Sequence, residues 1–214
     1  MSVGQPEKAW IILYPDTAFA EKKRCPERFK AAQENLKRCQ TAARAGKLSL
    51  FYPDGSGFSN IPNVQRAWAP KGKPHAADAS VARQRVNVVG ALGYATGKVW
   101  HDWHGQTVKR NAVVDLIDRI AQREQRMPLT LVVLDNARIH HNFDPQKLDE
   151  WLVGHRLVLM HLPPYSPELN PIGIVWKQAK YHWRRFVTWS KDGLLEEVQK
   201  LMIGVGSDFK IGFS

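Results

Sequence analysis

Two aspartates stand at the ends of two apolar segments, a pattern that can bring carboxylates together for metal chemistry. Asp54 follows "LSLFYP" and Asp135 follows "LTLVVL", and both segments are apolar enough to form buried strands. Ligands of α/β sheets gather outside the carboxyl ends of strands, so neighbouring strands would place both carboxylates together. Carboxylate oxygens suit Mg²⁺, and paired metals can activate water in phosphodiester chemistry. One such aspartate alone is more often a turn or helix-cap residue, and it is the pair that favours a metal site.

Polar residues follow the second aspartate directly. In "LDNARIHH", Asn136 and His140 can orient water or phosphate, although each taken alone is more often an ordinary loop residue. Zinc is disfavoured because neither of the two cysteines, Cys25 and Cys39, lies near a pair of histidines. The sequence also lacks the glycine patterns of P-loop and Rossmann nucleotide sites. An oxygen-liganded metal site is therefore the chemistry that the sequence favours.

The segment 162–177, "LPPYSPELNPIGIVWK", begins a helix with a glycine that local rules do not ask for. Asn170 suits the N-cap and Pro171 the first helical position, which puts Gly173 at the third. A capping box would have Glu or Gln there. Glycine inside a helix costs about 1 kcal/mol relative to alanine. Because nothing local demands a positive φ, the glycine needs another explanation.

The charge of the chain points to a polyanion. Thirty-one Lys and Arg against twenty Asp and Glu give a net charge of +11, which favours nucleic acid over an ordinary basic protein only when the basic residues cluster. One group shares a helical face with interleaved aromatic residues: Lys177, Lys180, Arg184 and Arg185, beside Trp176, Trp183 and Phe186. A second group flanks the first strand and the hairpin: Arg66, Lys71, Lys73, Arg83 and Arg85. We expect both to contact DNA phosphates, the alternative being solvated faces over an aromatic core.

The remaining pattern predicts one α/β domain over 47–205. A basic helical lead-in over 1–46 comes before it, Gly46 suits the end of its helix, and a tail over 206–214 follows. The expected elements are strands over 47–54, 64–74, 129–136 and 156–162, a turn over 55–63, a hairpin over 85–105, and helices over 107–126, 144–155, 171–186 and 191–203. These elements imply a mixed sheet flanked by helices. The composition is globular, with 43% hydrophobic residues, and contains neither a membrane span nor a signal peptide. Two cysteines fourteen residues apart fit a reducing cytoplasm.

Four segments together resemble a known family. "LFYPDGSGF", "RAWAPKGKP", "LVVLDNARIHH" and "HLPPYSPELNPIGIVWKQAK" resemble the catalytic domain of bacterial insertion-sequence transposases related to mariner. These enzymes belong to the DDE superfamily of endonucleases, with a ribonuclease H-like, retroviral integrase-like fold. The resemblance covers about 47–205. The last segment is the most specific, because these residues fit the family pattern: Pro163, Pro164, Tyr165, Ser166, Pro167, Leu169, Asn170, Pro171 and Trp176.

The resemblance assigns roles by position. The first two acids of the family fall on Asp54 and Asp135, while its third acid, a glutamate, falls on Gly173, thirty-eight residues after Asp135. The implied cofactor is Mg²⁺ or Mn²⁺ in a two-metal site whose second ion is weakly held because of Gly173. Glu168 lies five residues earlier, where ordinary variants of the motif carry an acid, so we do not expect it to replace the missing ligand.

The resemblance also implies a function and partners. We expect a DNA transposase domain that cleaves and transfers strands of double-stranded DNA, at transposon ends and at the target, near the nucleoid of a bacterial cytoplasm. A homodimer is expected, and Gly173 should impair activity. The rival interpretation is a non-catalytic DNA-binding protein derived from a transposase, which metal-dependent cleavage would distinguish. Such transposases usually carry an N-terminal helix-turn-helix, whereas 1–46 has one convincing helix, so we expect a fragment or the second half of a split reading frame.

Overall fold

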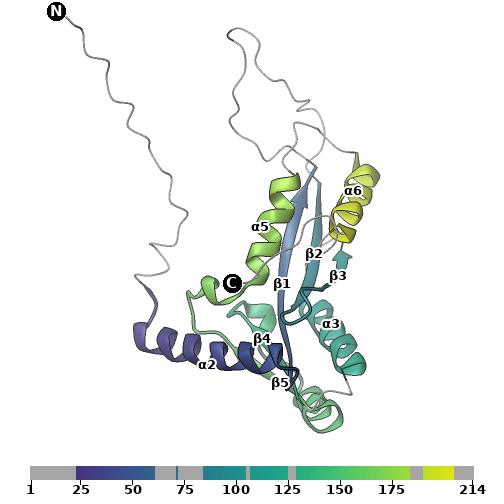
Figure 1. Ribbon diagram of the computed structural model, residues 1–214. Coiled ribbons are helices and arrows are strands. Elements are labelled where there is room, and N and C mark those ends of the chain that lie inside the picture. Colours follow the sequence, from purple (N-terminus) through teal and green to yellow (C-terminus); the bar gives the residue numbers. More distant parts are fainter. Residues whose placement is uncertain are drawn as a thin grey trace, which may run out of the picture.

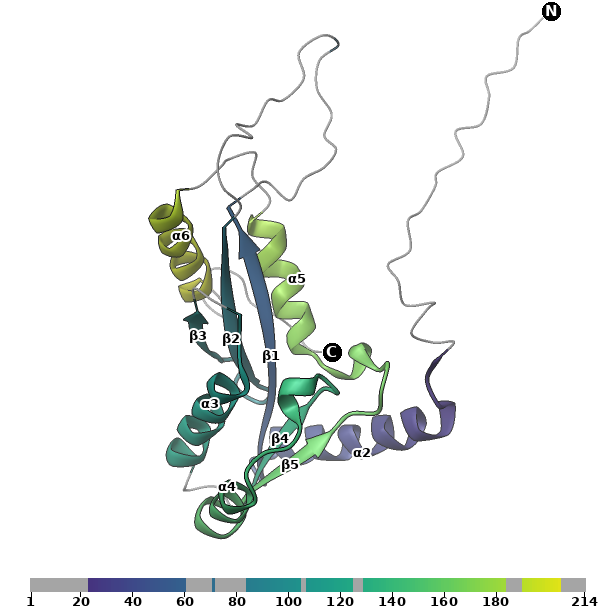
Figure 2. The same cartoon turned by 180° about the vertical axis from the view of Figure 1, so that it is seen from behind.

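The strands of the protein form one mixed sheet in the order β3-β2-β1-β4-β5, seen from both sides in Figures 1 and 2. This computed structural model describes residues 23–60, 71, 84–104, 107–124, 129–183 and 190–204. The strands are β1 (Ser49–Ser59), β2 (Arg85–Gly93), β3 (Val99–His104), β4 (Thr130–Leu134) and β5 (Leu157–His161). β1 is antiparallel to β2 and parallel to β4, β2 is antiparallel to β3, and β4 is parallel to β5. The predicted mixed α/β sheet is confirmed, and its fold is ribonuclease H-like.

Helices cover both faces of this sheet. They are α2 (Pro26–Arg44), α3 (Arg110–Arg123), α4 (Pro145–Asp149), α5 (Ile172–Trp183) and α6 (Lys191–Ile203), with short turns η1 (Arg138–His140), η2 (Glu150–Gly154) and η3 (Pro167–Leu169). α2, α5 and α6 contribute to one apolar core, and α3 contributes to the other together with Trp151 of η2. The α5 side of the sheet and the α3 side are thus two separate packing surfaces.

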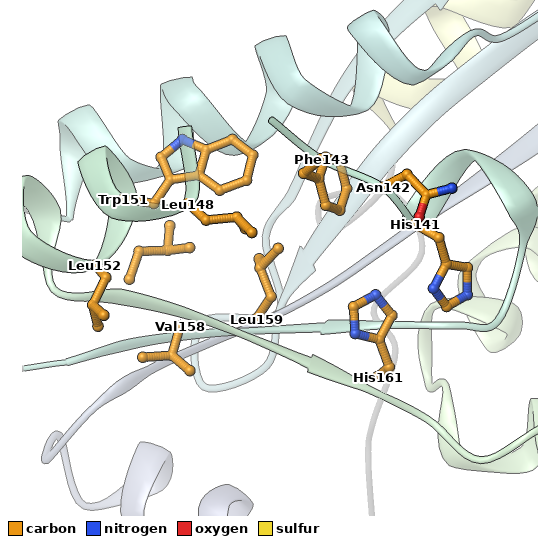
Figure 3. A pocket seen from close by; sticks show the side chains of 10 residues that line it. His141, Asn142, Phe143, Leu148, Trp151, Leu152, Val158, Leu159 and His161 are labelled. Carbon is orange, nitrogen blue, oxygen red and sulfur yellow. The ribbon is translucent and has the colours of Figure 1, made fainter. Parts of the chain in front are cut away.

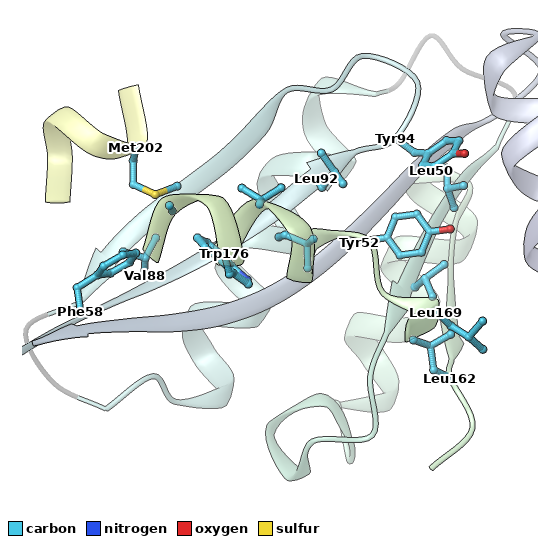
Figure 4. Packing of buried hydrophobic residues seen from close by; sticks show 14 of the residues in the cluster. Leu50, Tyr52, Phe58, Val88, Leu92, Tyr94, Leu162, Leu169, Trp176 and Met202 are labelled. Carbon is cyan, nitrogen blue, oxygen red and sulfur yellow. The ribbon is translucent and has the colours of Figure 1, made fainter. Parts of the chain in front are cut away.

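Alternation along the strands decides which residues join which core. In β1, Leu50, Tyr52 and Phe58 pack on the α5 side, whereas Phe51 packs on the α3 side. Figure 4 shows the α5-side cluster, in which Tyr52 and Phe58 point from β1 toward the helices. The same alternation assigns every other residue of β1 to one side, including those that are not apolar.

α3 forms because its apolar residues repeat at helical spacing. Val113, Leu116, Ile117 and Ile120 lie on one side of the helix and are all buried against the sheet. The predicted helix over 107–126 is therefore confirmed, although α3 is three residues shorter at each end. Gly46, predicted to end the first helix, follows α2 closely with a φ of +68°, a backbone conformation that glycine adopts without strain.

The predicted end of the first strand is wrong. We expected the strand to stop at Asp54 and a turn to cover 55–63, but β1 continues to Ser59. The reason is its partner: β2 pairs with β1 from Phe51 to Ser59, so backbone hydrogen bonding carries the glycine- and serine-rich stretch onward. Asp54 is consequently in the middle of a strand. The short strand predicted over 64–74 falls outside the described residues except for Lys71, as do 1–22 and 205–214.

The other predicted elements agree with the structure over the residues that it describes. The hairpin over 85–105 is β2 and β3, and the helix over 144–155 is α4 followed by the π-helical turn η2. Asp144 caps α4 by accepting a hydrogen bond from the Gln146 N–H at 2.9 Å, as predicted. Within the ranges that the structure describes, no helix is both long and apolar enough to cross a lipid bilayer.

The core assignment predicts unequal effects for two leucines. Leu116 is fully buried on α3 and Leu152 in η2 is 53% exposed. Leu116→Ala should lower the free energy of unfolding by about 2–5 kcal/mol, because it leaves a cavity against the sheet. Leu152→Ala is the matched control and should change it by at most about 0.5 kcal/mol. Urea unfolding measures both, and similar losses for the two variants would contradict the packing described here.

Candidate functional site

Asp54 and Asp135 lie at the same level on neighbouring strands. The parallel pairing of β1 with β4 runs to Phe51 opposite Val132, and three further residues along each chain reach Asp54 and Asp135. Both aspartates also continue the α5-side alternation, since Tyr52 of β1 and Val133 of β4 pack in the α5-side core. The predicted adjacency of the two strands is therefore found, with both side chains on one face.

The two strands end at different levels. β4 ends at Leu134, whereas β1 continues for several residues beyond Asp54. Asp54 therefore borders the turn that follows β4 on one side and β2 on the other. That turn contains Asp135 and η1, so the two carboxylates meet where the backbone of one strand has stopped.

The pKa of Asp54 is raised. Burial is the largest cause, and the negative charge of Asp135 raises the pKa further. The Gly55 N–H opposes this by donating a hydrogen bond to Asp54 Oδ1 at 2.7 Å, and His140 opposes it electrostatically. This repulsion between the two carboxylates agrees with their position on neighbouring strands.

The pKa of Asp135 is lowered instead. Burial alone would raise it, but hydrogen bonds from the His140 ring and from the Ala137 N–H, the latter at 3.0 Å, outweigh burial. The charges of His140 and His141 add to this effect. The pKa values of the two aspartates thus shift in opposite directions.

Three histidines, His140, His141 and His161, form a network of contacts next to Asp135. His140 is only 2% exposed and its Nδ1 pairs with Asp135 Oδ1. His161, the last residue of β5, contacts the His140 carbonyl oxygen through Nε2 at 2.7 Å. Its ring stacks on His141 with centroids 4.7 Å apart, and His141 Nε2 lies 2.8 Å from Asn136 Oδ1. The predicted supporting residues Asn136 and His140 therefore belong to one network around Asp135.

His141 and His161 were missed by the sequence reasoning. The signal for His161 was the same as for the aspartates, a polar residue at the end of an apolar strand. Figure 3 shows these two rings facing each other at one end of an apolar pocket of about 380 Å³. Trp151, Leu152, Val158 and Leu159 line the rest of that pocket.

The start of α5 corrects one prediction and confirms another. Asn170 does not cap the helix with its side chain, because that side chain is buried, 8% exposed, and its Oδ1 has no hydrogen-bond partner among the described residues. Asn170 directly follows the turn η3, and its backbone carbonyl accepts a hydrogen bond from the Gly173 N–H at 3.1 Å. Gly173 has no positive φ, and a Cβ there would meet no atom within 4 Å. Its backbone accordingly tolerates a side chain.

α5 packs on the sheet beside Asp54. The Trp176 indole lies against Gly90, where an added Cβ would come 3.0 Å from its Cη2 atom. Gly90 is the partner of Asp54 in β2. Gly173 precedes Trp176 by three residues, so the two lie on the same side of α5. The sequence indicates Trp176 as an aromatic residue beside the basic helical face and as part of the family motif, and assigns it no role at the site.

Few side chains near the two aspartates could bind a metal. Among the residues that the structure describes, no group of three or more His, Cys, Asp or Glu could hold an ion. Glu168 is engaged elsewhere, because its Oε1 pairs with Arg24 Nη1 at 2.9 Å, just before α2. Two carboxylates remain, and they fit one divalent cation whose other positions take water and phosphate.

The predicted DNA-binding residues fall on different parts of the molecule. Lys177 and Lys180 are exposed on α5, and Lys71 is exposed. Arg85 is also exposed, but it continues the alternation of Val89 on the α3 side, where its guanidinium lies against Gly57. The structure therefore separates Arg85 from the α5 lysines. The other residues of the two groups lie outside the described residues: Arg66, Lys73, Arg83, Arg184 and Arg185.

Comparison with known proteins agrees with this geometry. A family model described as DDE superfamily endonuclease matches residues 49–195. No curated protein sequence matches the chain. The fold is similar to that of Mos1 in three solved structures. They are a pre-cleavage Mos1 transpososome (TM-score 0.56, 13% identity), a Mos1 mariner paired-end complex with Mn (0.60, 13%), and a Mos1 transposase paired-end complex with the left transposon end (0.58, 14%).

These matches cover 95%, 95% and 96% of this chain but only 60%, 60% and 63% of the Mos1 chains. At 13–14% identity they establish the fold alone. The chain thus spans about three fifths of the length of the Mos1 proteins that it resembles.

The histidine network predicts a measurable role for His140. His140→Ala should lower the free energy of unfolding by about 1–3 kcal/mol, because it removes a buried hydrogen bond to a carboxylate. His141→Ala is the matched control from the next position and should cost less than about 1 kcal/mol, since its partner Asn136 is exposed. Urea unfolding without added metal compares them. Equal costs would show that the contact between His140 and Asp135 adds no stability.

Proposed function

This chain belongs to the DDE superfamily endonucleases, and from that premise we propose that it is the catalytic domain of a mariner-like DNA transposase with Asp54 and Asp135 as metal ligands. The observation that carries the proposal is the position of the two aspartates, level with each other on one face beside the end of β4. The proposed domain covers 47–205, preceded by the lead-in that contains α2.

The proposed chemistry is metal-dependent cleavage and transfer of DNA strands. A divalent cation, Mg²⁺ or Mn²⁺, would supply Lewis acidity and an activated water when bound. Asp135 would ligate it as a carboxylate, kept ionised and oriented by His140 and the Ala137 N–H. Asp54 would be the second ligand, and one of its oxygens already accepts a hydrogen bond from the Gly55 N–H. One of the solved Mos1 complexes is described as containing Mn, which agrees with a divalent ion.

Gly173 would limit this activity. In the proposed site it occupies the position of a third acidic ligand, and Glu168 cannot supply that ligand while it pairs with Arg24. A second ion would then be weakly held, so that attacking and leaving oxygens are not both stabilised. We infer that strand cleavage by this chain is slow. The open space around Gly173 and its ordinary backbone support the idea that a glutamate would fit there.

The proposed partner is double-stranded DNA, at transposon ends and at the target. The net charge of +11 and the exposed Lys177 and Lys180 support contact with phosphates. The Mos1 relatives of this fold are described in paired-end complexes with transposon ends, which supports a homodimer as the working form. Such a function implies a location with the DNA of a bacterial cytoplasm.

A second function is supported by the same glycine. A DNA-binding protein that kept the transposase fold but lost cleavage would show an intact core, a basic surface and an incomplete metal site. Gly173 is the observation that favours it. The two functions differ in one property, metal-dependent cleavage of DNA, which a nicking assay measures.

Restoring a carboxylate at position 173 should create metal dependence. Gly173→Glu should raise Mg²⁺- or Mn²⁺-dependent nicking of supercoiled plasmid DNA at low salt. Its melting temperature should also depend on Mg²⁺ more strongly than that of the unchanged chain. Removing the helix glycine gains up to about 1 kcal/mol and a carboxylate at the helix start adds a few tenths. Repulsion from Asp54 and Asp135 opposes this gain until a cation binds.

The matched control is Gly154→Glu. Gly154 ends η2, has an ordinary φ, and a Cβ there also meets no atom within 4 Å. This variant should change stability equally with and without Mg²⁺, and nicking should stay unchanged. If both variants respond to Mg²⁺ in the same way and neither gains nicking, position 173 is not a metal-ligand position and the DNA-binding function is favoured.

DNA binding should depend on salt through the α5 lysines. The double variant Lys177→Gln/Lys180→Gln should reduce the slope of log affinity against log salt by about 2, since each phosphate contact contributes about 0.9. Lys200→Gln is the control, because Lys200 is exposed on α6 and pairs with Glu197 at 2.9 Å. Fluorescence anisotropy with a duplex measures the slopes. A salt-independent affinity, or no binding at low salt, would contradict both proposed functions.

A further inference from the structure

The indole of Trp176 carries a buried N–H beside the proposed metal ligand Asp54. Trp176 is 5% exposed, and its Nε1 atom has no hydrogen-bond partner among the described residues. Figure 4 shows the side chain extending from α5 toward β1. Buried donors are nearly always hydrogen-bonded, because leaving one unpaired costs free energy. This N–H therefore needs an acceptor.

Because position 90 is a glycine, the Trp176 indole can lie directly on the sheet next to Asp54. Gly90 pairs with Asp54 across β1 and β2. A Cβ at Gly90 would lie 3.0 Å from the Cη2 atom of Trp176 and 3.2 Å from its Cζ2 atom. Glycine weakens a strand interior, and its presence there often marks close approach by another group. The group that approaches here is the Trp176 ring.

The nearest carboxylate can serve as the acceptor. Asp54 uses Oδ1 to accept from the Gly55 N–H, and each carboxylate oxygen has lone pairs for more than one partner. Burial raises the pKa of Asp54, and the Trp176 N–H is among the groups that lower it, although the two do not have the geometry of a hydrogen bond here. The terminal torsion of an aspartate is soft, so a small rotation of the carboxylate can bring it into that geometry.

We propose that Trp176 is the positioning residue of Asp54, its indole N–H donating to the carboxylate and fixing the direction in which that carboxylate meets a divalent cation. The inference rests on the proposed metal site and adds a residue to it. It gives the two aspartates matching support, since His140 already donates to Asp135. α5 would then contribute to the site in successive turns, with the ligand position at Gly173 and the positioning donor at Trp176.

The test removes the donor and keeps an aromatic ring. Trp176→Phe in the full chain should bind Mn²⁺ roughly tenfold more weakly than the unchanged protein, as is usual when the support of a metal ligand is lost. Electron paramagnetic resonance of free Mn²⁺ measures the affinity. Trp151→Phe is the matched control, because it removes an indole N–H that donates to Asp118 at 2.6 Å, away from the site. It should lower the melting temperature and leave Mn²⁺ affinity unchanged.

Equal Mn²⁺ affinity for Trp176→Phe and the unchanged chain would overturn the inference, as would an equal loss in Trp151→Phe. If the unchanged chain binds no Mn²⁺, the proposed metal site fails, and a metal-free readout decides on Trp176. In ¹⁵N-labelled protein the Trp176 indole signal is the one missing from Trp176→Phe. Asp54→Asn should shift that signal and leave the exposed Trp103 signal in place. An unmoved Trp176 signal would overturn the inference independently of any metal.

Discussion

The candidate site depends on one interaction, the parallel pairing of β1 with β4. This pairing sets Asp54 level with Asp135, and because β4 ends at Leu134, Asp135 lies in the turn beside Asp54. A slip of one residue in the register would turn Asp135 to the α3 side and separate the carboxylates. The apolar residues of β4 prevent such a slip, because Val133 and Val132 belong to different cores. Core packing thereby fixes the geometry of the acids.

Two partly buried carboxylates repel each other, and the hydrogen-bond donors that offset this repulsion are unequally divided between Asp54 and Asp135. Asp135 receives the strong donors, the His140 ring and the Ala137 N–H, so its pKa falls despite burial. Asp54 receives only the Gly55 N–H directly, so burial and the charge of Asp135 raise its pKa. A divalent cation between them would relieve the repulsion that remains. A third carboxylate at position 173 would increase that repulsion in the absence of metal, and glycine there avoids it at the expense of a ligand.

α5 joins the stability of the fold to the candidate site. Ile172, Val175 and Ala179 are fully buried in the α5-side core and hold the helix on β1 and β2. The same packing lays Trp176 on Gly90, the β2 partner of Asp54. Lys177 and Lys180 remain exposed on the same helix. One element therefore combines core packing, the site and part of the basic surface.

The sequence by itself determined the elements and the candidate acids, because their signals are local. Helical spacing predicts α3, turn residues predict the β2–β3 hairpin, and apolar runs ending in Asp54 and Asp135 indicate two strands with acids beside them. The odd glycine at position 173 was likewise visible in the sequence. Tertiary structure alone decided that β1 runs on past Asp54 and that Asn170 turns inward. It also decided that His161 contacts the His140 carbonyl and that Trp176 packs on Gly90, the strand partner of Asp54. Each of these depends on a partner far away in the chain: β2 for β1, the buried core for Asn170, η1 for His161 and Gly90 for Trp176. Spacing within one segment carries no information about such partners, because pairing and burial between distant segments arise only when the chain has folded.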